Sequence, residues 1–435
     1  MKSLKMLFLS VLVVIMLCLC GCKIFPANTY ELLSPPELTG DYYPIEKALA
    51  KSVGKDYTLR YPSGGDHRSA VTICDINDDG ENKAFAFYSL NNEEMHINMI
   101  VRNGEEWVSV DDQTITAGSV ERIDFCDLDG DGNEEVIVGW EMQASAEKQL
   151  AVYSVNGKKM LQRMLQRYSE YTFCDLDGDK IRELFVQQLN TTDAFNRASL
   201  YRLEKEGVTE LASCSLDRSV KTIVSIVENT LSNGQKAIYI DELKSSGAVT
   251  EVLYLNKGQL VNPLLEQTLG ENIRSARSSS LMCKDVNHDG ILEIPIFEEL
   301  PMANGEVSAE KVYCTRWSSF TGEMLVSKQS EIINQNDGYS MIIPETWVGN
   351  IAVSVDSNHH SRVFYVCDAD KNPVARLLEL NTYKIKDWDS KQVEALNASE
   401  EICRTNDNVI IGKVYCENEA LSITMEELKK MIYLN

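Results

Sequence analysis

Alternating carboxylates recur in short loops of this chain, and the clearest example is Phe125–Trp140, with the sequence FCDLDGDGNEEVIVGW. Asp127, Asp129 and Asp131 stand at positions 1, 3 and 5 of this loop, and Glu135 stands at position 9. Calcium takes about six to eight hard oxygen ligands at roughly 2.3–2.6 Å. Carboxylates placed this close together repel one another unless a cation lies among them. The spacing therefore predicts a calcium site.

The same loop recurs along the chain, which points to a repeated structural unit. Further copies begin at Asp75, Asp175 and Asp285, and a weaker copy at Asn229–Gly234 keeps too few oxygens to bind metal. With the weaker copy included, the loops begin about every fifty residues. The candidate ligands at positions 1, 3, 5 and 9 are Asp175, Asp177, Asp179 and Glu183; Asp285, Asn287, Asp289 and Glu293; and, at positions 1, 3 and 5 of the first copy, Asp75, Asn77 and Asp79.

Two copies depart from the pattern. Lys180 takes position 6 of the third copy, where the sharp turn favours glycine. Lys83 takes position 9 of the first copy, where its charge opposes calcium, and we expect it to pair with Asp75 and Asp79.

The segments around each loop read as β-strands. An apolar run leads into the loop, a second run follows it, and two more strands come after, with Asn103-Gly104 and Asn156-Gly157 marking hairpin turns in the first two units. Four antiparallel strands per repeat predict the blades of a β-propeller, about five in number, because radial closure leaves only short, protected sheet edges. Cys74, Cys126 and Cys174 each precede a loop and are expected to be buried apolar residues of these strands.

Helical calcium modules use similar loops but differ at position 12. An EF-hand needs a bidentate glutamate there and flanking helices. The chain instead has Ala86, Val138, Val186 and Ile296 at this position, each inside a strand-like run. A dockerin module also needs an acidic group near that position and a helix after it. Hairpin loops are therefore the favoured interpretation.

The loops resemble FG-GAP/VCBS-type repeats, in which Asp-x-Asp-x-Asp-Gly-x-x-Asp/Glu lies within a β-hairpin. The resemblance covers roughly residues 68–335 and implies an integrin-alpha-like β-propeller with calcium at the aspartates. We expect this calcium to be structural, holding the strands of each blade together.

The first 21 residues read as a bacterial lipoprotein signal peptide, with a basic start, an apolar stretch and the ending Leu19-Cys20-Gly21-Cys22. This ending resembles a lipobox, which implies lipid on Cys22 and attachment to the membrane of the bacterial cell envelope, outside the cytoplasm. An uncleaved anchor and an ordinary secretory signal are the alternatives. Residues 22–67 then predict a tether followed by a short helix over Tyr43–Val53.

The pattern changes after about residue 336, and residues 336–435 predict a small separate α+β domain. Residues near 387–396 are expected to be helical, and Thr424 and Glu427 form a capping box before a C-terminal helix. Asp368–Pro373 resembles the loop, but Arg376 at position 9 predicts a plain hairpin turn.

The formal net charge of -24 over 435 residues argues against nucleic acid as a partner. No catalytic motif is recognised in the sequence, so we expect no enzyme. The favoured function is a lipid-anchored surface module that binds an unknown protein or glycan ligand or serves as a scaffold. The alternatives are an accessory factor docking to another envelope protein through residues 336–435, and an exported polysaccharide-acting hydrolase or lyase.

Overall fold

The computed structural model describes residues 42–434 apart from 91–93, 144–146, 190–195, 206, 304–309, 389, 391–398 and 419. The predicted signal peptide, Cys22 and the tether lie outside these residues. The described part of the chain is mainly β-structure and forms six antiparallel sheets. None of its helices has the length and apolar character needed to cross a membrane.

The first three sheets contain the first three carboxylate loops. The first sheet comprises β1 (Thr58–Leu59), β2 (Val71–Cys74), β3 (Lys83–Leu90), β4 (Glu94–Asn103) and β5 (Glu106–Ile115). The second comprises β6 (Ser119–Cys126), β7 (Glu135–Glu141), β8 (Lys148–Asn156) and β9 (Lys159–Tyr168). The third comprises β10 (Glu170–Cys174), β11 (Glu183–Gln188), β12 (Asn196–Glu204) and β13 (Gly207–Leu216).

The other three sheets follow in chain order. The fourth comprises β14 (Thr222–Thr230), β15 (Lys236–Lys244), β16 (Gly247–Asn256) and β17 (Gln259–Val261). The fifth comprises β18 (Ile294–Glu299), β19 (Tyr313–Phe320), β20 (Leu325–Asn334), β21 (Tyr339–Ile343) and β27 (Ile432–Leu434). The sixth comprises β22 (Ile351–Asp356), β23 (Ser361–Cys367), β24 (Pro373–Lys384), β25 (Glu400–Arg404) and β26 (Asn408–Val414).

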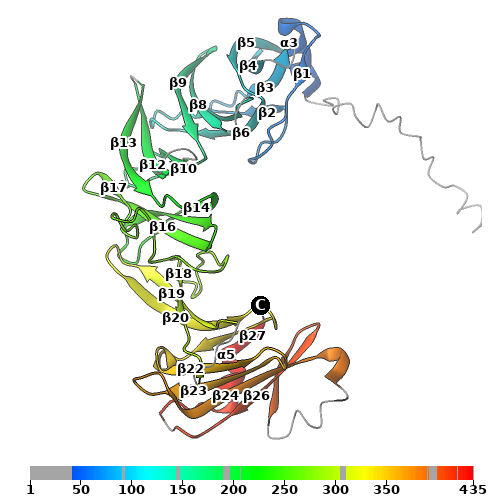
Figure 1. Cartoon of the computed structure of the whole chain (residues 1–435). Coiled ribbons are helices and arrows are strands. Elements are labelled where there is room, and N and C mark those ends of the chain that lie inside the picture. The colour runs from blue at the N-terminus through cyan, green and yellow to red at the C-terminus, as the bar shows by residue number, and fades with distance from the viewer. Residues whose placement is uncertain are drawn as a thin grey trace, which may run out of the picture.

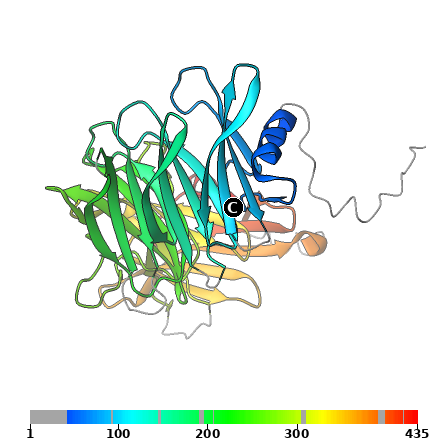
Figure 2. The same cartoon turned by 90° about the horizontal axis from the view of Figure 1, so that it is seen from above.

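The sheets follow one another along an arc, with the first and the sixth at its two ends (Figure 1). The first strands of the second, third and fourth sheets (β6, β10 and β14) lie toward the inside of the arc, and the last strands (β9, β13 and β17) lie toward the outside. Seen from above, the successive sheets stand face to face (Figure 2). Every inner sheet therefore has two neighbours against which it can bury side chains.

The hydrophobic cores lie between neighbouring sheets, and strand alternation explains why. Side chains along a strand point alternately to its two faces. In β7, Val136 and Val138 pack in the core shared with the first sheet, whereas Ile137 packs in the core shared with the third. In β11, Phe185 packs toward the fourth sheet. The strands β3 and β7 are apolar over most of their length because both of their faces are buried.

The predicted helix over Tyr43–Val53 is confirmed as α3. Its buried residues Ile45 and Leu49 pack on the outer face of the first sheet, against Ala84, Ala86 and Tyr88. A helix that covers the end of a stack shields an apolar face that no further sheet buries. The predicted propeller would instead use this face to close a ring, and among the described residues the six sheets form an open arc (Figure 1).

The covering role of α3 makes a testable prediction. Leu49→Ala is expected to lower the free energy of unfolding by about 2–5 kcal/mol, because Leu49 is fully buried beneath the helix. Chemical denaturation measures this change, and Lys51→Ala on the exposed face of α3 is the control. Equal stabilities for the two variants would contradict the packing of α3 as described.

The C-terminal segment continues the arrangement of sheets. The boundary predicted at 335/336 lies between β20 and β21, which pair with each other, and β21 pairs in turn with the terminal strand β27. The last hundred residues thus complete the fifth sheet and add the sixth. One core joins these two sheets to α5 (Met425–Met431), through Trp347 and Leu428 among others.

Three local predictions for this segment have different outcomes. The capping box at Thr424 and Glu427 is confirmed at the start of α5. The hairpin turn at Asp368–Pro373 is confirmed between β23 and β24. The predicted helix near 387–396 falls mostly on residues that are not described.

Candidate metal centre

The first three carboxylate loops each join two antiparallel strands, as predicted for hairpin loops. Cys74, Cys126 and Cys174 end the strands β2, β6 and β10, and each pairs with the residue at position 9 of its loop. These pairs bring the first and last positions of each loop together. In the fourth loop an isolated bridge between Lys284 and Glu293 does the same. No helix flanks any of these loops, so the EF-hand and dockerin alternatives do not apply.

The loop backbone turns sharply at positions 4 and 6, which both have positive φ in all four copies. The residues at position 6 are Gly80, Gly132, Lys180 and Gly290. Lys180, at φ 74°, is the only one of these with a side chain, and a left-handed conformation costs an L-residue roughly 1–2 kcal/mol. The third loop nevertheless keeps the shared turn, so the position 6 substitution does not change its shape.

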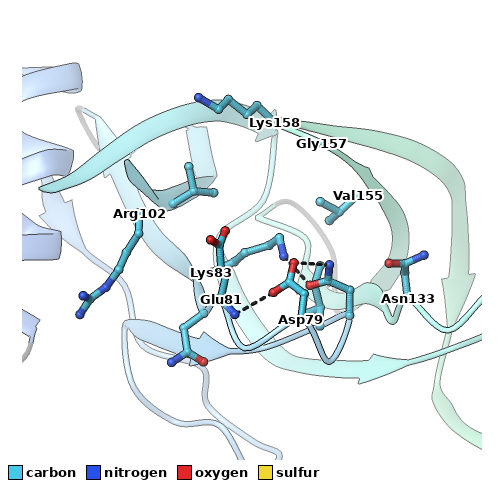
Figure 3. Close-up of a pocket in the computed structure, with 12 residues that line it drawn as sticks. Asp79, Glu81, Lys83, Arg102, Asn133, Val155, Gly157 and Lys158 are labelled. Atoms are coloured by element: carbon cyan, nitrogen blue, oxygen red, sulfur yellow. Dashed lines mark hydrogen bonds between the residues drawn. The ribbon is translucent and has the colours of Figure 1, made fainter. Parts of the chain in front are cut away.

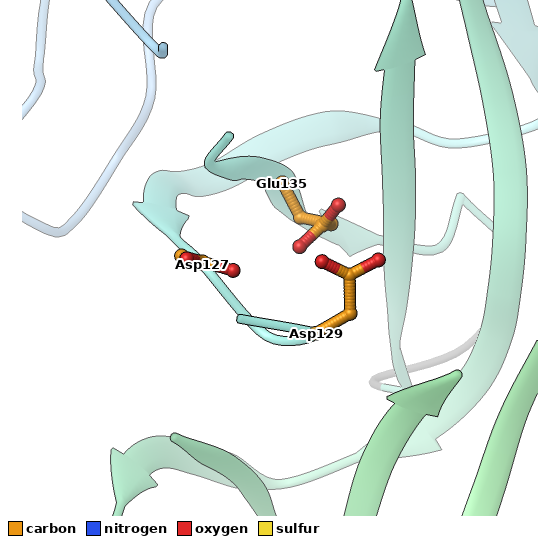
Figure 4. A group of neighbouring side chains, drawn as sticks. All are labelled: Asp127, Asp129 and Glu135. Carbon is orange, nitrogen blue, oxygen red and sulfur yellow. The ribbon is translucent and has the colours of Figure 1, made fainter. Parts of the chain in front are cut away.

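The second loop brings Asp127, Asp129 and Glu135 together, with one oxygen atom of each lying within 4.8 Å of the others. The carboxylates of Asp129 and Glu135 face each other, and Asp127 lies beside them on the loop (Figure 4). Backbone amides of Gly130 and Gly132 donate to the two oxygens of Asp127, at 2.7 and 3.0 Å, and hold it in place.

The predicted ligand Asp131 lies apart from this group. It is exposed, and its Oδ1 accepts hydrogen bonds from the backbone and side chain of Asn133 at 2.7 and 2.8 Å. Three of the four predicted ligands of the second loop are therefore assembled, and the fourth stays at the rim.

Glu135 is the buried carboxylate of the second loop, and its ionised form is disfavoured there. Its side chain is 3% exposed, and its Oε2 accepts a hydrogen bond from the amide of Leu128 at 3.0 Å. Burial raises the pKa of Glu135 to about 7, and the negative charges of Asp129 and Asp131 act in the same direction. A cation among these carboxylates would favour the ionised form.

This raised pKa predicts a pH dependence. Because the folded pKa lies above the unfolded one, the protonated Glu135 stabilises the calcium-free protein at low pH, and this stability is lost as pH rises through about 7. A calcium ion bound to Glu135 removes the free-energy cost of ionising this buried carboxyl group. The gain in melting temperature on adding calcium should therefore grow as pH rises through about 7, and Glu135→Gln should abolish this growth. A gain that is constant with pH would contradict the assignment of Glu135 as a ligand.

The third loop has the same carboxylate group, formed by Asp175, Asp177 and Glu183. Here the chain itself supplies a cation. Nη2 of Arg202, on β12, lies 2.9 Å from Asp177 and 3.1 Å from Asp179, and it also donates to the fully buried Glu183. The guanidinium thus stands where a metal ion would bind.

Sequence reasoning missed Arg202 because it lies outside the loop. Its strand β12 pairs with β11, and the partners Leu184 and Tyr201 place Arg202 beside Glu183. The identity of the residue opposite position 9 on the next strand of the hairpin would have indicated whether the chain supplies its own cation. In the second unit this residue is Ser154, whose hydroxyl contacts Glu135 and which carries no charge.

The first loop also contains a chain cation. Nζ of Lys83 donates to Oδ1 of Asn77 at 2.7 Å. The predicted ion pairs of Lys83 with Asp75 and Asp79 are not formed at contact distance. Asp75 accepts from backbone amides of its own loop, and the pKa of Asp79 is lowered by hydrogen bonds and, in addition, by the charge of Lys83. A hollow of about 310 Å³ lies next to this loop and the β8–β9 turn, with Lys158 on its rim (Figure 3).

The fourth loop resembles the second. Asp285 accepts from the amide of Gly290 at 2.8 Å, and Oε2 of Glu293 accepts from the amide of Val286 at 3.0 Å. Glu293 is fully buried, yet its Oε1 has no hydrogen-bond partner. Ser319, which follows the cross-strand partner of Ile294, is buried with its hydroxyl also unpartnered. The unpartnered oxygens of Glu293 and Ser319 are the kind of buried groups that a bound cation would satisfy.

The weaker copy at Asn229–Gly234 forms the turn between β14 and β15. Oδ1 of Asn229 accepts from the amide of Thr230 at 2.7 Å, and Oδ1 of Asn233 accepts from the amide of Gln235 at 2.9 Å. These contacts shape the end of β14 and the turn that follows it.

Comparisons with known proteins give no family. No family model matches the chain, and no curated protein matches it. Matches among solved structures include the Bacillus licheniformis rhamnogalacturonan lyase PL11 (10% identity, TM-score 0.31, 73% of this chain and 76% of that one). They also include the exotype rhamnogalacturonan lyase YesX (12% identity, TM-score 0.29, 83% and 73%) and a protein from Lactobacillus plantarum (8% identity, TM-score 0.27, 73% and 85%). At such TM-scores these similarities support no argument about fold or activity.

Proposed function

We propose that this chain is a calcium-stabilised scaffold of the FG-GAP/VCBS type, with structural calcium in its second and fourth loops. One observation carries the proposal. The second and third loops assemble the same three carboxylates, and the third places Arg202 among them whereas the second has the uncharged Ser154 at the same position. A site that one repeat fills with a guanidinium is a site that requires positive charge.

The loops lie where neighbouring sheets meet, which explains what a bound ion does. The amide of Glu134, at the end of the second loop, donates to the carbonyl of Ile76 in the first loop at 2.6 Å. Gly130 of the second loop lies so close to Ile181 of the third that a Cβ there would approach it to 2.9 Å. An ion that fixes the second loop therefore fixes the junctions among the first three sheets.

Calcium suits these sites better than other divalent ions. The candidate ligands are carboxylate and amide oxygens on a loop whose geometry is set by backbone hydrogen bonds, and calcium accepts such varied oxygen sets. Magnesium demands near-octahedral geometry and retains several waters. Zinc prefers nitrogen and sulfur ligands, and no histidine or cysteine stands at position 1, 3, 5 or 9 of any loop.

The location outside the cytoplasm belongs to the same proposal and depends on residues 1–22 alone. A signal peptide ending at Gly21 and lipid on Cys22 would hold the sheets at the surface of the envelope, where calcium is available. Incorporation of labelled fatty acid into the wild-type chain, and its loss in Cys22→Ala, tests this part separately.

Limited proteolysis tests the scaffold role. Calcium is expected to protect the junctions around the second loop, and chelation is expected to open cleavage sites there before the rest of the chain is cut, because local opening exposes the least stable segment first. Magnesium serves as the control ion. Identical cleavage patterns with calcium, magnesium and chelator would overturn the proposal.

A further inference from the structure

A second group of acidic side chains lies between the third and fourth sheets, away from the carboxylate loops. Glu242 on β15 and Glu251 on β16 are both fully buried, and both strands face the third sheet at these positions. Each carboxyl group acts directly on the pKa of the other, so the two groups are close neighbours. Two neighbouring acids in a protein interior require something positive between them.

Two amide side chains and one backbone amide surround this pair. Nε2 of Gln187, on β11 of the third sheet, donates to Oε1 of Glu242. Nδ2 of Asn262 and the backbone amide of Asp217 both donate to Oε1 of Glu251, at 2.7 and 3.0 Å. These contacts use one oxygen of each carboxylate. Four buried oxygens then have no partner: Gln187 Oε1, Glu242 Oε2, Glu251 Oε2 and Asn262 Oδ1.

Lys244, on the same strand as Glu242, is already engaged. Nζ of Lys244 lies 2.5 Å from Asp217, which is itself fully buried. Among the described residues no ion pair involves Glu242 or Glu251. Burial, together with the neighbouring acid, raises the pKa of Glu242, and burial raises that of Glu251 to about 7. The chain therefore leaves this pair without a counter-charge.

We propose that Gln187, Glu242, Glu251 and Asn262 form an internal cation site that joins the third sheet to the fourth. A proton shared by the two carboxyl groups would settle their mutual repulsion but would leave both amide oxygens without a partner. A metal ion satisfies all four oxygens, and unpartnered buried oxygens are costly, at roughly 1–3 kcal/mol each.

The ligand chemistry identifies the class of ion. All four donor atoms are oxygens, two of them from carboxylates, so a divalent ion neutralises the site. Calcium accepts side-chain amide oxygens beside carboxylates that bind through one or both oxygens. The site shares no residue with the four loops, so the proposal of this site can be tested separately from the function proposed above.

Elemental mass spectrometry of the full chain, after calcium loading and removal of free ion by gel filtration, tests the site. Glu251→Gln keeps the shape of the side chain and is expected to lower bound calcium by one ion per chain. Glu242→Gln should do the same. Glu271→Gln, a partly exposed acid at the surface of the same region, is the control and should change nothing. The loop variant Asp127→Ala/Asp129→Ala should lose its own ion and retain this one.

An unchanged calcium content in both Glu→Gln variants would overturn the proposal and assign a shared proton to the pair. Thermal unfolding separates the same two outcomes if a variant folds poorly. The internal site predicts that Glu242→Gln removes part of the calcium-dependent rise in melting temperature. A shared proton predicts that this variant, whose amide can donate to Glu251, keeps the full rise.

Discussion

Arg202→Ser is expected to make the third loop dependent on calcium. The substitution removes the guanidinium from Asp177, Asp179 and the fully buried Glu183, and it installs the residue type that faces Glu135 in the second unit. Removing one partner of a buried ion pair costs about 3–5 kcal/mol, because the other charge stays buried alone. The variant should lose stability of this order in chelator and recover much of it with calcium.

Chemical denaturation of the wild type and the variant, each with calcium and with chelator, measures this effect. The control is Arg197→Ser on the same strand, since Arg197 forms an exposed pair with Glu210 and should cost at most about 1 kcal/mol in either condition. An Arg202→Ser variant that is equally unstable with and without calcium would show that the third loop cannot hold the ion. A variant as stable as the wild type would show that Arg202 does not balance these carboxylates.

Loss of the second site is the other large effect expected. Calcium that binds only the native state stabilises it by about 4 kcal/mol when its concentration is a thousand times the dissociation constant. Thermal unfolding should therefore shift upward by several degrees on adding calcium to the wild type. Asp127→Ala/Asp129→Ala removes two of the three assembled ligands and should lose the contribution of the second loop to this shift.

The chain offers a matched control for this measurement. Asp368 and Asp370 form a turn that resembles the carboxylate loops in sequence, but Arg376 stands at its position 9. The backbone amides of Asp370 and Asn372 occupy Oδ1 of Asp368. Asp368→Ala/Asp370→Ala should leave the calcium-dependent shift intact. If both double variants respond to calcium like the wild type, the second loop is not a metal site.

Local sequence predicted the hairpins and most of the loop geometry because these depend on neighbouring residues. Alternating aspartates, glycines at the turns and apolar strands on either side are all visible within sixteen residues such as Phe125–Trp140. The helix α3 and the capping box of α5 were predictable for the same reason.

Features that depend on pairing between strands could not be read from the loop alone. Arg202 lies nineteen residues after Glu183 and reaches it only through the register of β11 with β12. The proximity of Glu242 to Glu251 requires the register of β15 with β16 together with the packing of the third sheet. The sixth sheet contains only the Asp368–Pro373 turn, which has Arg376 in place of an acidic residue at position 9, so the repeat pattern did not extend to this sheet.

The arc also depends on tertiary contacts. The sequence predicted a helix at Tyr43–Val53, and the structure shows that its apolar side covers the first sheet. A short amphipathic helix gives no indication of which surface it will cover. Its position at the end of the arc explains why the predicted ring closure is not seen in the described residues (Figure 1).

The most direct test of the account is a crystal structure of the chain grown with calcium, with the ions located by anomalous scattering. We predict an ion among Asp127, Asp129 and Glu135 and another at Asp285 and Glu293, with oxygen ligands at roughly 2.3–2.6 Å. The third loop should hold the guanidinium of Arg202 and no ion. An ion in the third loop with Arg202 displaced, or no ion in the second loop, would contradict the account.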